Sequence, residues 1–235
     1  MRSKAIFILS IAAMMFVVSS CSERDSVKVK DKQKSDGKTE ILDASKKNVD
    51  VTAEKTKTIN NLKDAYKGEV TASTKYAAYS KKAKEEGYLK IALLFEAVSK
   101  SESIHANNHK DALEELGEKP YDFKPEYEVK TTKENLEESI NGETNEVDNM
   151  YPDFIRTANN GAVNIALLTF NYAYRTEMKH KPMYENALNK LNAGQENTLP
   201  DKYWVCTTCG NTYDSQPQKR CSLSMTPSDR LMVVQ

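Results

Sequence analysis

Proline and glycine are scarce in this sequence, with seven and eight among 235 residues. Both residues interrupt helices, so their scarcity makes long uninterrupted helices plausible. A net charge is also lacking, because 34 basic residues balance 34 acidic ones, and this excludes a global positive field that would recruit nucleic acid. What is present, 29% charged and 39% hydrophobic residues, is typical of amphipathic helices rather than of a thick buried sheet.

Long hydrophobic runs are lacking too, except at residues 5–18. This run has the length of a signal-peptide core and is too short to span a bilayer comfortably. It ends in Val-Ser-Ser-Cys, which resembles a bacterial lipobox, where cleavage leaves a diacylated cysteine at the new N-terminus. We expect a lipoprotein signal peptide at residues 1–20 and an exported protein that Cys21 anchors to a membrane of the cell envelope. The alternative is an ordinary cleavable signal peptide followed by a chance cysteine.

Residues 21–55 lack aromatic side chains and any helical or strand period, and they are rich in lysine and aspartate. Such a segment cannot bury enough surface to order itself, so we expect a flexible tether. Helical periodicity begins near Thr56 and continues to Gly194. Four helices are expected, at about residues 56–86, 89–116, 132–158 and 162–193.

The connections between these helices indicate the topology. Residues 117–131 form a link that is too long for a tight antiparallel turn and fits the crossover connection of ferritin-like bundles. Thr131 and Asn135 are candidate caps of the third helix, and Pro182 is expected to kink the fourth. The predicted fold class is mainly α: a ferritin-like four-helix bundle at residues 56–194, with a long crossover and a small C-terminal domain.

Histidine is rare, yet two of the three histidines follow a glutamate by three positions, as Glu102-x-x-His105 and Glu177-x-x-His180. Residues at i and i+3 share a helix face, so each pair directs a carboxylate and an imidazole at one point. Taken singly, each pair is equally typical of a solvated surface. Two such helices, with two more that carry an inward glutamate, form the ligand set of a dinuclear iron or manganese site. The third histidine, His109, is expected at the surface.

The inward glutamates are Glu69 and Glu143, because each follows a glycine at matching points of an internal repeat. Glu69 precedes Glu102 by 33 residues, and Glu143 precedes Glu177 by 34. An Ile-Ala-Leu-Leu run occurs in both halves, at residues 91–94 and 165–168. We expect the turn at residues 159–161 to absorb the extra residue. A repeat of helix pairs supplies the quasi-twofold ligand placement that a two-metal site needs.

Further polar residues accompany these glutamates. Glu146 lies three residues after Glu143 and is expected to point inward. Tyr76 and Tyr151 lie seven and eight residues after Glu69 and Glu143, on similar faces. These tyrosines are candidate hydrogen-bond donors to the carboxylates. The alternative is that they are ordinary core residues.

At residues 56–225 the chain is similar to rubrerythrin. The matching runs are Gly68-Glu69-x6-Tyr76, Lys84-Glu85-Glu86-Gly87-Tyr88-x2-Ile91-Ala92, Glu102-x2-His105, Gly142-Glu143-x2-Glu146-x4-Tyr151-Pro152 and Glu177-x2-His180. The resemblance implies a di-iron site. Its implied ligands are Glu69, Glu102, His105, Glu143, Glu146, Glu177 and His180. It also implies that Glu146 and His105 exchange at one iron on redox change, that the protein is a homodimer, and that it reduces hydrogen peroxide to water in oxidative stress defence.

A cysteine knuckle follows Pro200, as Cys206-x2-Cys209-Gly, and Cys221 follows it. This spacing resembles the rubredoxin-like iron module that rubrerythrins carry, so residues 200–235 are expected to form such a domain. The fourth thiolate position holds Ser224. Three outcomes are open: Ser224 binds iron as an alkoxide, the site binds iron weakly or takes zinc, or Cys206 and Cys209 form a disulfide.

The expected function is that of a non-haem di-iron peroxidase, an oxidoreductase whose C-terminal iron relays electrons from an unknown donor to the two irons of the bundle. Two alternatives remain at this point. One is a ferroxidase or iron-handling protein, and the other is a non-catalytic metal-binding protein of the envelope. The loss of the fourth cysteine favours both alternatives slightly, whereas the full ligand set with Glu146 favours the peroxidase.

Overall fold

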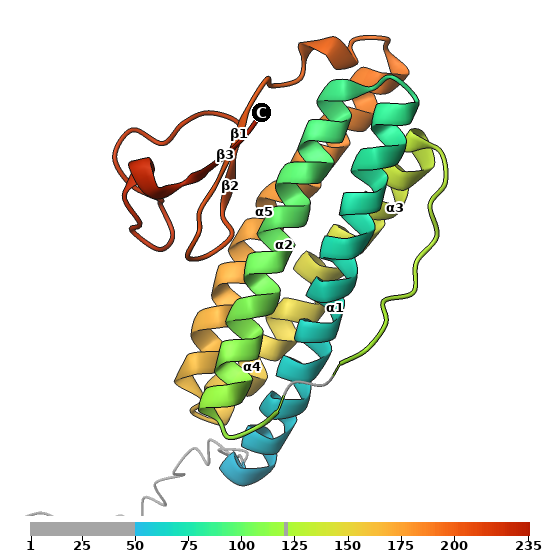
Figure 1. Ribbon diagram of the computed structural model, residues 1–235. Helices are drawn as coiled ribbons and strands as arrows, with labels where there is room; N and C mark the ends of the chain where they lie inside the picture. Colours follow the sequence, from blue (N-terminus) through green and yellow to red (C-terminus); the bar gives the residue numbers. More distant parts are fainter. Residues whose placement is uncertain (1–49, 120–121) are drawn as a thin grey trace, which may run out of the picture. The chain divides into compact units, whose positions relative to one another are not determined.

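The structure is a computed structural model that describes residues 50–119 and 122–235 (Figure 1). The expected signal peptide, Cys21 and the tether up to residue 49 lie outside the described residues. Among the residues that are described, no helix is both long enough and apolar enough to cross a membrane.

Long helices run side by side and form a bundle (Figure 1). They are α1 (Val51–Glu85), α2 (Leu89–Glu115), α3 (Thr132–Asn145), α4 (Tyr151–Asn160) and α5 (Asn164–Asn192). α1 packs along α2, whereas α3 and α4 pack end to end along α5. A π-helical turn, η1 (Glu146–Met150), joins α3 to α4, so the third predicted helix is continuous but not α-helical throughout. α5 continues through Pro182 as a single helix.

The first helix begins five residues before the position that periodicity predicts. Asp50 caps it, because its carboxylate accepts hydrogen bonds from the backbone amides of Thr52 and Ala53, at 3.0 and 3.1 Å. The first turns of α1 also pack on Gly161, where an added Cβ would lie 2.9 Å from the backbone nitrogen of Lys55. Residues 51–55 are therefore part of the bundle rather than of a tether.

Thr131 caps α3, and Glu134 completes a capping box with it. Asn135, the other candidate, lies inside the helix. Its side chain instead bonds to both backbone groups of Lys130, at 2.9 and 3.1 Å, and so holds the end of the crossover.

The internal repeat has one extra residue, and the structure places it differently from the expected turn. Glu69 and Glu143 are 74 positions apart, but Tyr76 and Tyr151 are 75 apart. The same separation of 75 holds for the residues with positive φ in the two tight turns, Gly87 and Ala162. The extra residue therefore lies between Glu143 and Tyr151, where the chain forms the π-helical turn.

The expectation that residues 159–161 absorb the extra residue is wrong, since the separation has already changed before that turn. The pairing of the two Ile-Ala-Leu-Leu runs is one residue out of register for the same reason. In the structural register Ile91 corresponds to Ala166 and Phe95 to Phe170, and all four of these side chains are fully buried.

The C-terminal segment forms a three-stranded antiparallel sheet beside the bundle (Figure 1). Its strands are β1 (Tyr203–Val205), β2 (Thr212–Tyr213) and β3 (Met232–Val234), in the order β2-β1-β3. Trp204 pairs with Tyr213 on one side and with Val233 on the other. Tyr203, Val205 and Val234 join the apolar core of the bundle, so the sheet and the helices are packed together.

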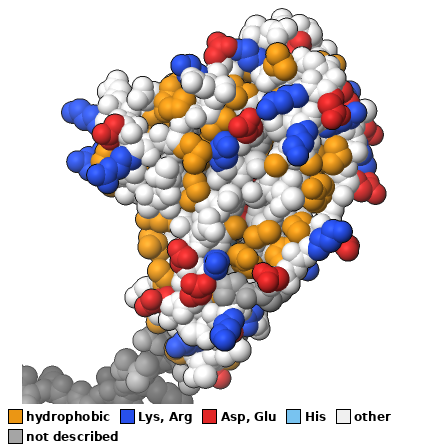
Figure 2. Space-filling model, in the orientation of Figure 1, with side chains coloured by type: hydrophobic (Ala, Val, Ile, Leu, Met, Phe, Trp, Pro, Cys, Tyr) orange, Lys and Arg blue, Asp and Glu red, His pale blue; other side chains and the backbone are white. Residues whose placement is uncertain are grey.

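Charges of both signs are mixed on the face that Figure 2 shows, with apolar side chains between them. No histidine is visible there. All three histidines of the chain are buried. The sites that they form are therefore internal.

Candidate metal centres

Two groups of buried ligand atoms meet inside the bundle. Within each group, one ligand atom of every residue lies within 4.8 Å of the others. The first group is Glu69, Glu102, His105 and Glu177, and the second is Glu102, Glu143, Glu177 and His180. Glu102 and Glu177 belong to both groups, so these two carboxylates are placed to bridge two metal ions.

Each Glu-x-x-His pair lies on the inward face of its helix, α2 or α5. His105 Nδ1 is 2.9 Å from Glu102 Oε2 and 2.9 Å from Glu177 Oε1. His180 Nδ1 is 3.1 Å from Glu102 Oε1 and 2.6 Å from Glu177 Oε2. Both imidazoles thus direct the same ring nitrogen at the same two carboxylates.

The donor atoms fit a pair of metal ions. Several of them are buried without a hydrogen-bond partner among the described residues: Glu69 Oε2, both carboxylate oxygens of Glu102, His105 Nδ1, Glu143 Oε2 and Glu177 Oε1. Buried polar atoms are nearly always satisfied, so a cluster of unsatisfied ones needs an explanation. Carboxylate oxygens with one imidazole per metal are ligands that suit iron or manganese.

The far nitrogens of both imidazoles are hydrogen-bonded. His105 Nε2 lies 3.1 Å from the carbonyl oxygen of Cys209, and His180 Nε2 lies 2.9 Å from the hydroxyl of Thr212. A carbonyl oxygen only accepts, so Nε2 of His105 carries the proton. Thr212 donates to the carbonyl of Gly210 and therefore accepts from His180. In both rings Nδ1 is therefore the nitrogen that can bind a metal once its proton is displaced.

The carboxylates of the site differ in proton affinity. Burial raises the pKa of Glu69 to about 7, although His105 opposes this. Burial and the charges of Glu177 and Glu102 hold the pKa of Glu143 well above its usual range. Burial acts in the same direction on Glu177, but the nearby imidazoles of His180 and His105 outweigh it and lower the pKa. Metal binding at this site must therefore displace protons.

The two tyrosines contact carboxylates of the opposite half. Tyr76 on α1 donates to Glu143 Oε1 on α3, at 2.8 Å, and Tyr151 on α4 donates to Glu69 Oε1 on α1. In each carboxylate the other oxygen has no hydrogen-bond partner. The phenols thus occupy one oxygen of each glutamate, and the second oxygen is free of hydrogen bonds to the described residues.

Glu146 lies on the π-helical turn and is partly buried. Burial and the charges of Glu69 and Glu177 hold the pKa of its carboxyl group well above its usual range. It does not belong to either group of ligand atoms. The structure therefore brings six of the seven expected ligands together, and the ligand role of Glu146 stays a prediction.

His109 is not a surface residue, and the expectation that it is exposed was wrong. Its ring is fully buried and lies 3.1 Å from the hydroxyl of Thr169 through Nδ1 and 3.2 Å from that of Tyr151 through Nε2. A position four residues after His105 is on the same helix face, and this spacing was the signal that could have found it.

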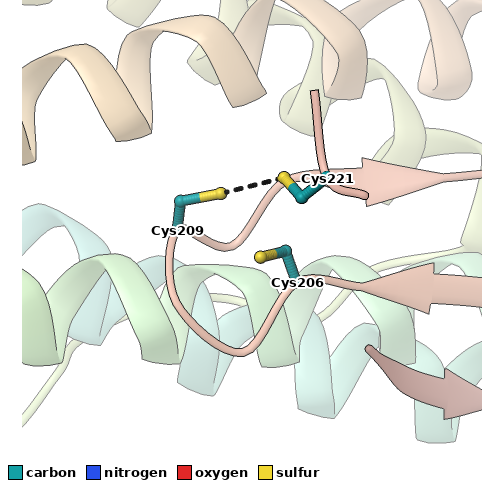
Figure 3. Close-up of side chains that lie close together, drawn as sticks. All are labelled: Cys206, Cys209 and Cys221. Carbon is teal, nitrogen blue, oxygen red and sulfur yellow. Dashed lines mark hydrogen bonds between the residues drawn. The ribbon is translucent and has the colours of Figure 1, made fainter. Parts of the chain in front are cut away.

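The three cysteines at the C-terminus form a second candidate site. Figure 3 shows the side chains of Cys206, Cys209 and Cys221 converging between two loops. Their sulfur atoms lie within 4.8 Å of one another, and all three residues are fully buried. The cysteines are free, with 3.5 Å between the sulfurs of Cys209 and Cys221, so they do not form the alternative disulfide.

Ser224 lies beside this cluster, with its Oγ 3.2 Å from the sulfur of Cys206. The same oxygen is 2.8 Å from Thr226 Oγ1, which donates its proton to Thr208. Because a hydroxyl carries one proton, Thr226 accepts from Ser224, and an oxygen lone pair of Ser224 is left on the side of the sulfurs. Three thiolates and one hydroxyl oxygen fit a single metal ion, iron or zinc.

The cysteine knuckle lies directly on α2, next to the histidine of the first ligand group. Ser101 Oγ donates to the carbonyl of Gly210 at 2.7 Å, and Asn108 donates to the carbonyl of Thr208 at 3.0 Å. Gly210 has φ +76°, and an added Cβ would overlap Nε2 of His105. A glycine is needed here for both its conformation and its size.

The bundle with its two ligand groups and the cysteine site define a ferritin-like dinuclear metal protein with a small rubredoxin-like C-terminal domain. Comparison with known proteins names the family. The model of the rubrerythrin family matches residues 60–188, and the chain belongs to this family.

Individual relatives agree. Nigerythrin of Nitratidesulfovibrio vulgaris is 33% identical over 180 residues, which cover 73% of this chain and 84% of that protein. Rubrerythrin-2 of Clostridium acetobutylicum is 29% identical over 174 residues, which cover 74% and 94%. Among solved structures, nigerythrin in its fully reduced, all-ferrous state matches with a TM-score of 0.67 and 32% identity, over 75% of this chain and 86% of that one. The similarity extends over the bundle and most of the described chain.

Proposed function

We propose that this protein is a di-iron peroxidase of oxidative stress defence. In the reaction, hydrogen peroxide accepts two electrons and two protons, its O–O bond breaks, and two molecules of water leave. The observation that carries the proposal is the pair of ligand groups that share Glu102 and Glu177 and lie against the cysteine knuckle. Two irons, when bound, supply the two electrons and the coordination positions at which peroxide binds.

The residues of this chain supply the surroundings that the reaction needs. Six buried side chains hold the metals, and the phenols of Tyr76 and Tyr151 orient Glu143 and Glu69. Glu146 lies on a turn whose wider helical geometry gives it room to move. We infer that it is the seventh ligand and that it exchanges with His105 on redox change. The interior excludes bulk water, so peroxide meets a site of low dielectric.

Electrons reach the site through the C-terminal domain in this proposal. The carbonyl of Cys209, itself part of the thiolate cluster, lies 3.1 Å from Nε2 of His105. A short hydrogen-bonded path thus joins a metal held by Cys206, Cys209, Cys221 and Ser224 to a ligand of the bundle site. The donor that reduces the C-terminal metal is of unknown identity.

The proposed setting of the protein is the cell envelope. We propose that it is exported, that Cys21 carries a lipid anchor, and that it acts as a homodimer. Metabolic labelling with a fatty acid tests the anchor, because the label should be lost in a Cys21→Ala variant and kept in the parent. Sedimentation of the iron-loaded chain in detergent tests the dimer.

The peroxidase proposal is tested by reoxidation kinetics. The full-length chain is loaded with iron, reduced, and mixed with hydrogen peroxide or with oxygen. Rapid stoichiometric reoxidation by peroxide is expected, and Glu146→Ala should abolish it. Glu137→Ala is the matched control, because Glu137 is exposed on the same helix, α3. A reaction with peroxide no faster than that with oxygen would favour a ferroxidase, and no reaction with either would favour a non-catalytic metal-binding protein.

A further inference from the structure

The two halves of the bundle differ at one pair of equivalent positions next to the ligands. His109 and Tyr184 are 75 residues apart, as are Glu102 and Glu177, and both side chains are fully buried. Each lies beside the tyrosine that holds a carboxylate. The ring of His109 is centred 6.2 Å from that of Tyr151, and the ring of Tyr184 is 5.5 Å from that of Tyr76.

Only one of these neighbours is hydrogen-bonded to its tyrosine. His109 Nε2 lies 3.2 Å from the hydroxyl of Tyr151, whereas the hydroxyl of Tyr184 has no hydrogen-bond partner among the described residues. Glu69 is therefore held by a phenol that has a second partner, and Glu143 by a phenol without one. This asymmetry lies outside the ligand set.

The number of protons available fixes the direction of the hydrogen bonds that join His109, Tyr151 and Glu69. A carboxylate that binds a metal is ionised and only accepts, so Tyr151 must give its single proton to Glu69. The oxygen of Tyr151 then accepts from His109, and Nε2 must carry a proton. On the other side of the ring, Nδ1 lies 3.1 Å from the hydroxyl oxygen of Thr169, and that oxygen also lies 3.3 Å from the carbonyl oxygen of Ala166, to which it donates.

We propose that His109 is a positioning residue: through Nε2–H it holds Tyr151 in the orientation that donates to Glu69, and so makes the two metal positions unequal. The directed chain runs from His109 to Tyr151 and to Glu69 Oε1, and it leaves Oε2 of Glu69 for the metal. This role concerns the geometry of a ligand. It does not depend on peroxide chemistry, so the role of His109 can be tested separately from the proposed function.

The protonation pattern can be read directly. The full-length chain is loaded with zinc, which is diamagnetic, and the ring nitrogens of His109 are observed by nitrogen-15 NMR. A proton on Nε2 is expected, and Tyr151→Phe should shift the Nε2 resonance because its acceptor is lost. An Nε2 without a proton, or an Nε2 resonance that Tyr151→Phe does not move, would overturn the proposal even if no His109 variant folds.

Metal affinity tests the consequence. Cobalt(II) is titrated into the metal-free full-length chain and followed by its visible absorption. His109→Phe keeps a ring of similar shape but removes both hydrogen bonds, and we expect one of the two binding steps to weaken by about 10-fold to 100-fold. His109→Gln retains an N–H donor at similar reach and should restore most of that affinity. Adding His109→Phe to Tyr151→Phe should cause no further loss, because His109 acts through Tyr151.

Tyr184→Phe is the control from the other half of the bundle. It removes a hydroxyl that makes no hydrogen bond to the described residues, so both binding steps should keep their wild-type affinity. Equal weakening of both steps in His109→Phe, or a His109→Gln variant as weak as His109→Phe, would show a merely structural role and contradict the proposal.

Discussion

Ser224 differs from the expected cysteine by an oxygen in place of sulfur, and this changes the character of the C-terminal site. Oxygen is a harder ligand than a thiolate, so it stabilises the ferric state and lowers the reduction potential of an iron bound there. The hydroxyl of Ser224 lies beside the sulfur of Cys206 and donates a hydrogen bond to Thr226. An oxygen thus lies beside the three sulfurs, at the place where the spacing predicts a fourth ligand.

Two replacements of Ser224, by cysteine and by alanine, should have opposite effects on metal binding at this site. Ser224→Cys supplies a fourth thiolate, so the iron-loaded chain should show stronger sulfur-to-iron absorption in the visible range and a higher reduction potential. Ser224→Ala leaves three thiolates, and the metal should dissociate more readily. Both changes are measured by visible spectroscopy during a redox titration, and identical spectra for the parent and Ser224→Ala would show that Ser224 is not a ligand.

Metal affinity of the bundle site should rise with pH. The carboxylates of Glu177 and Glu102 outweigh burial and raise the pKa of His180 to about 9, so at neutral pH a metal must displace its proton. Raising the pH towards 9 removes this competitor, and acidification strengthens it. Between pH 6 and 8, the apparent affinity for cobalt(II) should rise about tenfold per pH unit for each proton displaced. A pH-independent affinity in calorimetric titrations would contradict this.

Spacing found most of the ligands because helical periodicity converts it into a shared face. Glu102 with His105 and Glu177 with His180 needed no tertiary information beyond that rule. His109 was missed because its neighbours in the chain are polar, which is typical of a solvated face. Its spacing from His105 places it on the same face of α2, but the aromatic rings of Tyr151 and Phe170 that it contacts there lie on other helices.

The π-helical turn is the element that distinguishes the third helix from the first. One extra residue between Glu143 and Tyr151 is accommodated within the helix, and the tyrosine still reaches a carboxylate as Tyr76 does in the other half. The turn thus accommodates the extra residue while Tyr151 keeps the role that Tyr76 has in the other half. Single π-helical turns within α-helices are frequent at functional sites.

Removal of the extra residue should separate metal binding from reactivity. Deleting the exposed Asn149 restores the seven-residue spacing of α1, so the helix should stay intact and both ligand groups should still bind metal. Glu146 would then project from a regular α-helix, away from its present position. We expect retained helicity by circular dichroism, two bound irons, and slow reoxidation by peroxide.

Asn149→Ala is the control for this deletion, because it alters the same side chain at constant length. It should react like the parent. Rapid reoxidation of the deletion variant would show that the π-helical turn is not needed to place Glu146.

Helices were easier to predict than their boundaries. The early start of α1 depends on the cap that Asp50 supplies and on the close contact between Lys55 and Gly161, which lies more than 100 residues further along the chain. The spacing from Glu143 to Glu177 does not locate the extra residue of the repeat, because any point between them satisfies it. The equivalence of Tyr76 with Tyr151 and of the two tight turns places it before Tyr151. Local sequence patterns predict that a helix is present, whereas tertiary contacts determine the residue at which it begins.

At the scale of the whole molecule, the main feature is the contact between the cysteine knuckle and α2. Ser101, His105 and Asn108 contact three consecutive carbonyls, those of Gly210, Cys209 and Thr208. The sequence predicts each partner, a helix and a knuckle, but not their contact. That contact depends on complementary shape at residues about 100 positions apart.

Substitution of Gly210 should disrupt this contact. In Gly210→Ala the positive φ costs roughly 1–2 kcal/mol, and the new methyl group would also overlap His105. We expect a lower melting temperature, faster hydrogen exchange in the C-terminal domain, and slower electron transfer to the bundle irons. Gly68→Ala is the control. Gly68 lies inside α1 with no atom within 4 Å of an added Cβ, so the change should stabilise the protein by about 0.5–1 kcal/mol. Unchanged hydrogen exchange in Gly210→Ala would contradict the close contact.

The two imidazoles end on different partners, a peptide carbonyl for His105 and a hydroxyl for His180. This difference affects how the two hydrogen bonds respond to substitution of their partner residues. A peptide carbonyl is present whatever side chain the residue carries, so this hydrogen bond of His105 places no demand of its own on the side chain at position 209. The hydrogen bond of His180 depends on the hydroxyl of Thr212 and is lost when that hydroxyl is removed. Thr212→Val should therefore release the ring of His180 from its partner, whereas Thr212→Ser should keep the hydrogen bond.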